Sequence, residues 1–151
     1  MWADGSAPSG DPTREARIRL QADSRSVRDG LHQAFSLPPL SLLMAEDRST
    51  AEIVLAEVLN NVVEHAYAQG SGLILLTLSL GDGLLHCQVE DEGAAMPGGQ
   101  APAGQPPDPS DLSEGGFGWH LIRTLCRTLR YERADGLNRL SFSLPAERSR
   151  G

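Results

Sequence analysis

Three polar side chains that could bind a ligand or take part in a reaction stand at regular intervals in an otherwise apolar stretch. Glu57, Asn61 and His65 lie one and two helical turns apart within EVLNNVVEHAY (57–67). In a helix, this spacing places them within about 80° of one another on one face. A carboxylate and an amide oxygen one turn apart suit a hard cation such as Mg²⁺, which takes further oxygens from water and from a phosphate substrate. From spacing alone, the alternative is a solvated polar face, although such faces usually carry Lys, Arg and Glu.

A second chemical feature is VEDEG (89–93), at the end of an expected strand. Asp91 shares its parity with three apolar residues of that strand, Leu85, Cys87 and Val89, and is therefore predicted to point into the core. A buried carboxylate needs a partner, and the exocyclic amino group of a purine would serve as the donor. Gly93 lets the backbone turn sharply and approach that partner closely. The alternative is that the strand ends earlier and Asp91 only begins a turn.

A third feature is GGFGWHLIR (115–123), in which glycines precede and open a predicted helix. Free amides at a helix N-terminus, with glycines that permit close approach, can bind an anion. The segment lacks the preceding strand and the lysine of a P-loop. The chain in fact contains no lysine, so every fixed cation is an arginine. The alternative is a flexible loop end, and Trp119 and His120 are expected to pack rather than to react.

Hydrophobic periodicity and turn residues predict the elements that must position these groups. In chain order they are a half-buried strand over 14–22, a helix from a Ser24 cap to about Leu37, a helix from Asp47 or Ser49 to Ala68 ended by Gly70, strands over 72–80 and 84–91 joined by GDG, a helix from about Gly116 to Leu129, and a hairpin of LRYER and LNRLSFSL turning at ADG (134–136). We therefore expect an α+β two-layer sandwich with a mixed, mostly antiparallel sheet and three helices on one face.

Composition sets the remaining bounds. The 151 residues fit one domain, predicted over 14–145 with flexible tails at 1–13 and 146–151. With 13 basic and 20 acidic residues, the net charge of −7 argues against a general nucleic-acid or anionic-membrane binder. No apolar stretch reaches the length of a membrane helix, and the two cysteines lack metal spacing, so we predict a cytoplasmic protein with reduced thiols.

The three motifs follow one another in an order that resembles a known family of domains. Glu57-x₃-Asn61-x₃-His65 is followed by Asp91-x-Gly93, a Pro/Gly-rich loop (94–114) and Gly116-x-Gly118-x-x-Leu121. This series resembles the N-box, first glycine box, ATP lid and second glycine box of the GHKL (Bergerat) ATP-binding fold, which includes gyrase-type and histidine-kinase ATPase domains. The small size and the histidine of NVVEHAY are most similar to the anti-sigma-factor serine-protein kinases.

The resemblance implies two cofactors, ATP and Mg²⁺, and a role for each matching residue. It makes Asn61 the Mg²⁺ ligand, Glu57 the general base toward a serine hydroxyl, and His65 a positioning residue. It makes Asp91 the adenine-reading carboxylate, with Gly93 beside it. The phosphates would be contacted by the second glycine box, Gly116, Phe117 and Gly118.

The activity implied is that of a serine-protein kinase, a homodimer, that phosphorylates a STAS-type anti-sigma antagonist and sequesters a sigma factor. Two positions depart from the family pattern: Ala95 replaces the second glycine of D-x-G-x-G, and Glu114 stands where many relatives have a basic residue. An ATP- or ADP-binding partner switch without phosphoryl transfer is therefore the alternative. A detached histidine-kinase domain is disfavoured because His65 replaces the basic residue common at that N-box position. A sandwich that binds no nucleotide is the remaining possibility.

Overall fold

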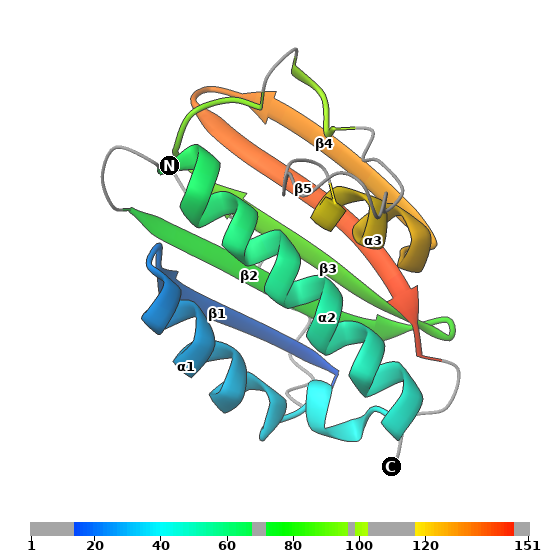
Figure 1. The fold of residues 1–151 in the computed structure, drawn as a ribbon. Helices are drawn as coiled ribbons and strands as arrows, with labels where there is room; N and C mark the ends of the chain where they lie inside the picture. The colour runs from blue at the N-terminus through cyan, green and yellow to red at the C-terminus, as the bar shows by residue number, and fades with distance from the viewer. Residues whose placement is uncertain (1–13, 68–71, 97–98, 103–116, 147–151) are drawn as a thin grey trace, which may run out of the picture.

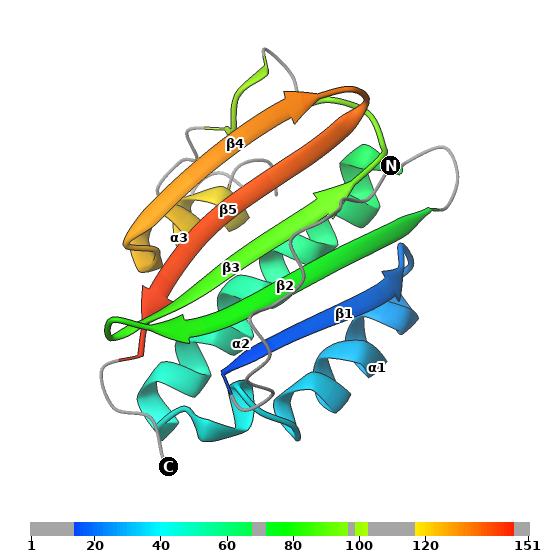
Figure 2. The same ribbon diagram turned by 180° about the vertical axis from the view of Figure 1, so that it is seen from behind.

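The computed structural model describes residues 14–67, 72–96, 99–102 and 117–146. Three helices cover one face of a five-stranded sheet, as Figures 1 and 2 show from opposite sides. The elements are β1 (Glu15–Gln21), α1 (Ser24–Phe35), α2 (Ala45–Asn61), β2 (Leu73–Gly81), β3 (Leu84–Asp91), α3 (Phe117–Leu125), β4 (Thr128–Ala134) and β5 (Leu137–Pro145). A short 3₁₀ helix (Leu40–Leu42) precedes α2, and a π-helical turn (Val62–Ala66) follows it. The predicted α+β two-layer architecture is confirmed.

The strands are arranged in the order β1-β2-β3-β5-β4. All four pairings are antiparallel, so the mixed character that we expected is absent among the described strands. Both hairpins turn through an Asp-Gly pair with positive φ, Asp82-Gly83 (57° and 74°) and Asp135-Gly136 (54° and 77°). Such turns match the twist of the flanking strands. The register of the pairing between β3 and β5 sets Asp91 opposite Asn138.

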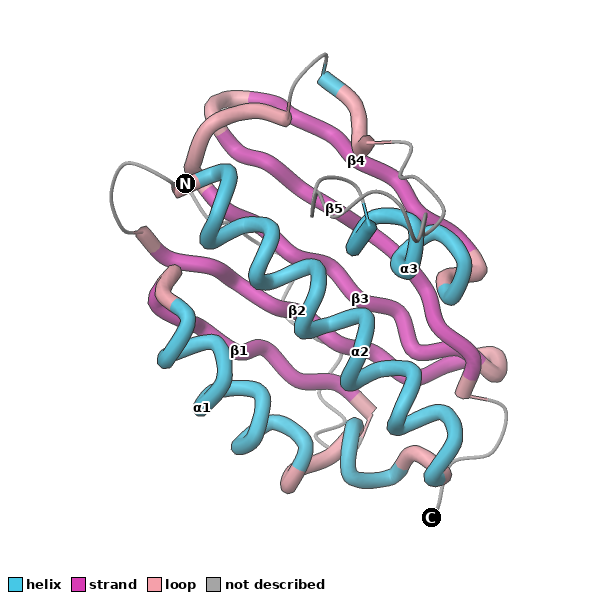
Figure 3. The backbone as a smooth tube through the Cα atoms, in the orientation of Figure 1, coloured by secondary structure: helices cyan, strands magenta, loops and turns pink. Residues whose placement is uncertain are grey.

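The core lies between the sheet and α2, and Figures 1 and 3 show α2 lying over the face of the sheet. Alternate side chains of the central strands point to the helices and are fully buried, among them Ile74, Leu76, Leu78, Leu85 and Val89. Helix α2 covers them with its own apolar stripe, Val54, Leu55, Val58 and Leu59. Each such side chain contributes about 1.5–3 kcal/mol on burial. This contact fixes the rotation of α2 and therefore the direction of its polar residues.

Three predicted helix boundaries were wrong. Asp23, not Ser24, caps α1, because its Oδ1 accepts the Ser26 N–H at 2.7 Å. Helix α2 begins at Ala45, before the predicted Asp47 or Ser49. Helix α3 ends at Leu125 instead of Leu129, which belongs to β4 and pairs with Phe142. The apolar spacing that suggested a longer helix is satisfied on the inner face of a strand.

Helix α2 ends in a π-helical turn. Regular α-helix stops at Asn61, and the Tyr67 N–H then bonds the Val62 carbonyl at 3.2 Å, which closes a wider π-helical turn. Helical structure was predicted to reach Ala68 before Gly70, and residues 68–71 lie outside the described part of the chain. The wider turn alters the direction of His65 relative to Asn61. Within the described residues, no helix is long and apolar enough to span a membrane.

Candidate functional site

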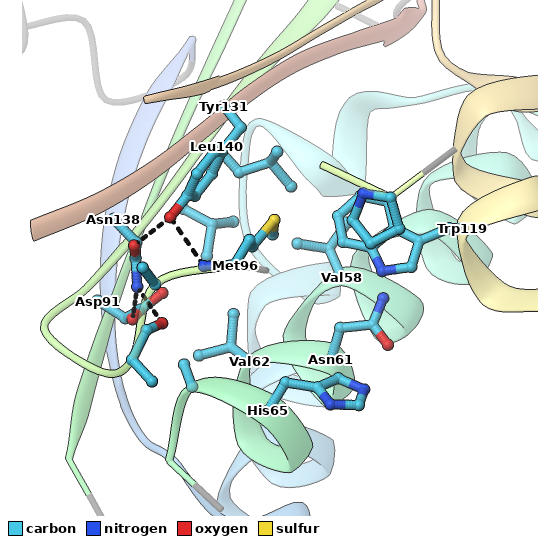
Figure 4. Close-up of a pocket in the computed structure, with 15 residues that line it drawn as sticks. Val58, Asn61, Val62, His65, Asp91, Met96, Trp119, Tyr131, Asn138 and Leu140 are labelled. Atoms are coloured by element: carbon cyan, nitrogen blue, oxygen red, sulfur yellow. Dashed lines mark hydrogen bonds between the residues drawn. The ribbon is translucent and has the colours of Figure 1, made fainter. Parts of the chain in front are cut away.

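A cavity of about 220 Å³ opens where the end of α2 meets β3, β5, β4 and α3. Its wall combines apolar side chains with a few polar groups, and Figure 4 shows how they converge. The lining residues are Val58, Asn61, Val62, His65, Ala66, Val89, Asp91, Ala94, Ala95, Met96, Pro102, Trp119, Tyr131, Asn138 and Leu140. A mostly apolar concavity with few convergent polar groups is the usual form of a small-molecule site. Of the predicted site residues, Asn61, His65 and Asp91 line this single cavity.

Asp91 forms the polar end of the cavity. Only 4% of the residue is exposed, as its strand parity predicted. Its Oδ1 accepts two hydrogen bonds, from the Gly93 N–H at 2.9 Å and from Asn138 Nδ2 at 2.8 Å. Burial raises the pKa of Asp91, and the bonds from Asn138 and Gly93, together with the charge of Arg133, oppose that rise. The carboxyl group is therefore desolvated and held in place through one of its two oxygens.

Gly93 brings the end of β3 against the end of α2. A Cβ at position 93 would lie 2.4 Å from the Ala66 carbonyl oxygen and 2.7 Å from its carbonyl carbon. The adjacent Ala94 N–H bonds that same oxygen at 2.9 Å. A glycine is thus needed at position 93, but the close neighbour is the π-helical turn of the protein itself, whereas the sequence predicted close approach to the partner of Asp91.

Asn61 lies on the opposite wall of the cavity from Asp91 (Figure 4). Among the described residues, its Nδ2 is the buried side-chain polar atom without a hydrogen-bond partner. Such an atom is costly unless a ligand satisfies it. Rotation of the amide presents either its nitrogen or its oxygen to this space. His65 lines the same wall with an exposed side chain, 4.0 Å from the Glu64 carboxylate.

The residues fit a Mg²⁺ ion only if a substrate supplies most of its ligands. The described residues contain no group of three His, Cys, Asp or Glu side chains that could hold a metal ion. The Asn61 amide can contribute one oxygen, which is a ligand type that Mg²⁺ accepts alongside water and phosphate. The atom without a partner is Nδ2, and exchange of the amide nitrogen and oxygen positions would place the oxygen there instead.

Glu57 stands one turn before Asn61 and faces the start of α3 rather than the lining of the cavity. A Cβ at Gly118 would lie 2.5 Å from its Oε2, so the half-buried carboxylate occupies the space that glycine leaves. Gly116 lies outside the described residues, and Phe117 is described only as the first residue of α3. The structure thus brings Glu57 and Gly118 together, beside the cavity that Asn61, His65 and Asp91 line.

The first residues of the predicted lid form part of the cavity wall. The Met96 N–H bonds the Tyr131 hydroxyl at 3.1 Å, and Ala95 lines the cavity beside it. The next described residues, 99–102, contact α3, because the Arg123 guanidinium donates hydrogen bonds to the Ala101 and Pro102 carbonyls at 2.9 and 2.7 Å. Position 114, where the family pattern calls for a basic residue, lies outside the described residues.

Sequence reasoning missed three side chains that line the cavity, Trp119, Tyr131 and Asn138. Trp119 was expected to pack, and it is 6% exposed, yet its indole also forms a wall of the cavity. Asn138 carried a usable signal. It has the parity of the buried Leu140, Phe142 and Leu144, so a polar group faces the core just as Asp91 does on the neighbouring strand.

A two-layer sandwich with a buried carboxylate at a strand end, across a cavity from an amide at the end of a long helix, is the arrangement that the resemblance to the GHKL fold predicts. The chain belongs to the histidine kinase-like ATPase domain family, whose model matches residues 10–144. It is similar to the serine/threonine-protein kinase BtrW of Bordetella bronchiseptica, with 30% identity over 130 residues that cover 83% of this chain and 90% of that protein.

A solved structure shows the same fold. The crystal structure of the RsbU and RsbW domains of Rv1364c from Mycobacterium tuberculosis matches with a TM-score of 0.55 and 22% identity. The match covers 93% of this chain and 34% of the other, so this chain corresponds to about a third of that longer protein. The predicted resemblance to the GHKL, histidine kinase-like ATPase domains is confirmed by the family model, and the similarity to a serine/threonine-protein kinase agrees with it.

Proposed function

We propose that the protein is an ATP-binding serine-protein kinase of a partner-switching system. It would phosphorylate a STAS-type anti-sigma antagonist and sequester a sigma factor, acting in the cytoplasm as a homodimer. One observation carries the proposal: a desolvated, oriented Asp91 and an Asn61 side chain with a buried, unpartnered Nδ2 line one mostly apolar cavity from opposite walls. The similarity to a relative named as a serine/threonine-protein kinase supports it.

The base of the nucleotide would bind at the Asp91 end. Because Oδ1 is engaged by Gly93 and Asn138, Oδ2 is the oxygen left to accept a hydrogen bond from the 6-amino group of adenine. The apolar lining, Val58, Val62, Val89, Met96 and Leu140, would take the faces of the ring. An ionised carboxylate accepts hydrogen bonds only, so it favours an amino group over a carbonyl at that position.

The phosphates would extend toward Asn61 and the start of α3. Asn61 would hold Mg²⁺ through its amide oxygen, with the remaining ligands from phosphate and water. A bound Mg²⁺ neutralises the charge that develops on the transferred group. The backbone N–H groups at the start of α3, including those of Phe117 and Gly118, point along the helix axis and favour an anion.

Glu57 would act as the general base. Its carboxylate would take the proton from a serine hydroxyl of the partner while that oxygen forms a bond to the γ-phosphorus and the bond to the β-phosphate oxygen breaks, which releases ADP. The absence of a side chain at Gly118 leaves room for the carboxylate next to the predicted phosphate-binding turn. Positioning and charge neutralisation are the main requirements of such a transfer.

A second function is favoured by the charge of the cavity. Within the described part of the chain, no arginine lines it, and His65 is the one lining residue able to carry a positive charge. Ala95 also occupies the wall where the family pattern has glycine. The alternative proposal is therefore an ATP- or ADP-sensing switch that binds its partners without transferring phosphate.

Calorimetric titration with Mg-ATP and Mg-ADP tests the shared basis of both proposals. Asp91→Asn should abolish binding, and Asn61→Ala should weaken its dependence on Mg²⁺. Asn60→Ala is the matched control, because Asn60 is an exposed neighbour on the same helix. Incubation with labelled ATP and a STAS-type protein of the same organism then separates the two: phosphoserine on that protein supports the kinase, and a nucleotide-dependent complex without phosphate supports the switch. Absence of nucleotide binding by the unmodified protein overturns both.

A further inference from the structure

Asn138 uses every hydrogen-bonding group of its side chain within the protein. It is 4% exposed and lies on β5 directly across from Asp91. Its Nδ2 donates to Asp91 Oδ1 at 2.8 Å, to the Ala94 carbonyl at 2.9 Å and more weakly to the Gly93 carbonyl at 3.3 Å. Two amide protons therefore serve the carboxylate and the backbone that follows it. Nothing on this nitrogen remains for a nucleotide.

The oxygen of the same amide is engaged from β4. Asn138 Oδ1 accepts from the Tyr131 hydroxyl and from Arg133 Nη1, the latter at 2.8 Å. The Tyr131 oxygen in turn accepts the Met96 N–H at 3.1 Å. A continuous chain of hydrogen bonds thus runs from Asp91 through Asn138 and Tyr131 to Met96. Figure 4 shows this chain along one side of the cavity.

We propose that Asn138 and Tyr131 are positioning residues that orient Asp91 for the purine amino group and couple this base-binding end of the cavity to the Ala94–Met96 segment of its wall. The inference rests on the proposed nucleotide binding and goes beyond it. Asn138 selects which carboxylate oxygen faces the cavity. Tyr131 bonds both Asn138 and Met96, and it thereby links the position of the Asp91–Asn138 pair to the first residues after β3.

The coupling follows from the shared partners. If the purine moves Asp91, the Asn138 amide must follow or lose its 2.8 Å bond, and the Ala94 and Tyr131 contacts then change with it. Buried hydrogen-bond networks behave as units in this way, because an unsatisfied member is costly. The segment after β3 should therefore be more strongly ordered when the base is bound than when the cavity contains only water.

The first test compares ATP with purine riboside triphosphate, which carries hydrogen in place of the 6-amino group. In the unmodified protein ATP should bind more tightly. Asn138→Leu keeps side-chain volume but removes the bond to Asp91, and it should reduce the ATP preference about tenfold, the scale of one hydrogen bond to a charged group. Asn60→Leu on the exposed face of α2 is the control. Binding of purine riboside triphosphate, which lacks the amino group read by Asp91, should stay near that of the unmodified protein, whereas a general loss of structure would weaken it.

The second test measures amide hydrogen exchange, first without nucleotide and with a variant that removes a single hydroxyl group. Tyr131→Phe removes only the hydroxyl, and it should speed amide hydrogen exchange at Met96 by about tenfold. Exchange at Ala94, whose N–H bonds Ala66, should change much less. In the unmodified protein ATP should slow exchange at Met96, and Asn138→Leu should remove most of that effect.

The outcomes separate the two ideas. Absence of nucleotide binding by the unmodified protein overturns the proposed function, and this inference with it. If the unmodified protein prefers ATP but Asn138→Leu keeps the same preference, the nucleotide function stands and the positioning role is wrong. Equal exchange at Met96 in Tyr131→Phe and the unmodified protein overturns the coupling through Tyr131.

Discussion

The carboxylate of Glu57 fills the space in which a side chain at Gly118 would begin. An ideal Cβ on Gly118 would lie 2.5 Å from Glu57 Oε2 and 3.4 Å from its Cδ. Glycine is therefore required at this position by a neighbouring side chain on α2, without any need for positive φ. The contact joins the helix that carries Glu57 and Asn61 to the first turn of α3.

Gly118→Ala should strongly slow the proposed phosphoryl transfer with little effect on stability. The displaced atom is the flexible end of Glu57, and alanine favours a helix over glycine by up to about 1 kcal/mol, so the Tm should not fall. Phosphoryl transfer to a STAS-type partner should drop about 10²-fold, as in Glu57→Gln. The double variant should lose no more than either single variant, because both changes remove one function. Additive losses would show that Glu57 and Gly118 act separately.

Gly93→Ala should lower the free energy of unfolding. The added methyl group would meet backbone atoms of Ala66 at 2.4 and 2.7 Å, and a helix end cannot move aside as easily as a side chain. Overpacking of this kind costs about 1–3 kcal/mol. The midpoint of urea unfolding measures it. Gly81→Ala is the control, because no atom lies within 4 Å of its added Cβ, and its midpoint should stay near that of the unmodified protein. Equal midpoints for the two variants would contradict the prediction.

Much of the site was predictable from residue parity and helical spacing. The inward direction of Asp91 followed from Leu85, Cys87 and Val89, and the exposed side of α2 followed from its apolar stripe. His65 was less predictable, because the π-helical turn after Asn61 breaks the regular spacing on which its placement depended. The turn arises where Ala66 meets Gly93 and Ala94, which is a contact between distant segments.

Other parts of the site depend on pairings that no local pattern contains. Asn138 meets Asp91 only because β5 lies beside β3, and the sequence does not fix that strand order. The end of α3 has a similar cause. The Arg127 N–H bonds the Ser143 carbonyl at 2.8 Å, and this sheet contact outweighs the helical spacing of Leu125 and Leu129.

The pH dependence of stability should report on Asp91. Burial raises its pKa above 3.8 in the folded protein. Below 3.8 the carboxyl is protonated in both states, and as pH rises toward the folded pKa only the unfolded state ionises freely. The contribution of Asp91 to stability is therefore present at low pH and lost as pH rises through this window. The Asp91→Asn variant has no carboxyl group to ionise at this position. Its unfolding free energy should therefore increase relative to that of the unmodified protein as pH rises from about 4. A pH-independent difference would contradict the prediction.

The two thiols should resist alkylation in the native state. Burial raises the pKa of Cys126 to about 11, and burial, followed by the nearby Cys126, raises that of Cys87 well above its usual value. Because the thiolate is the nucleophile, Cys126 should react about 100-fold more slowly at neutral pH than in urea. Mass spectrometry after iodoacetamide treatment measures this. Labelling of native Cys126 at the unfolded rate would show that its surroundings are open to solvent.

The place of Trp119 in the cavity wall gives the protein a built-in optical reporter. Its indole is 6% exposed and lies against the space proposed for the nucleotide. The chain has one other tryptophan, Trp2, in the N-terminal segment outside the described residues. Trp2→Phe would leave a single emitter beside the site. Ligand entry would then be visible as a change in ultraviolet fluorescence, without any label, on the millisecond scale of a stopped-flow instrument.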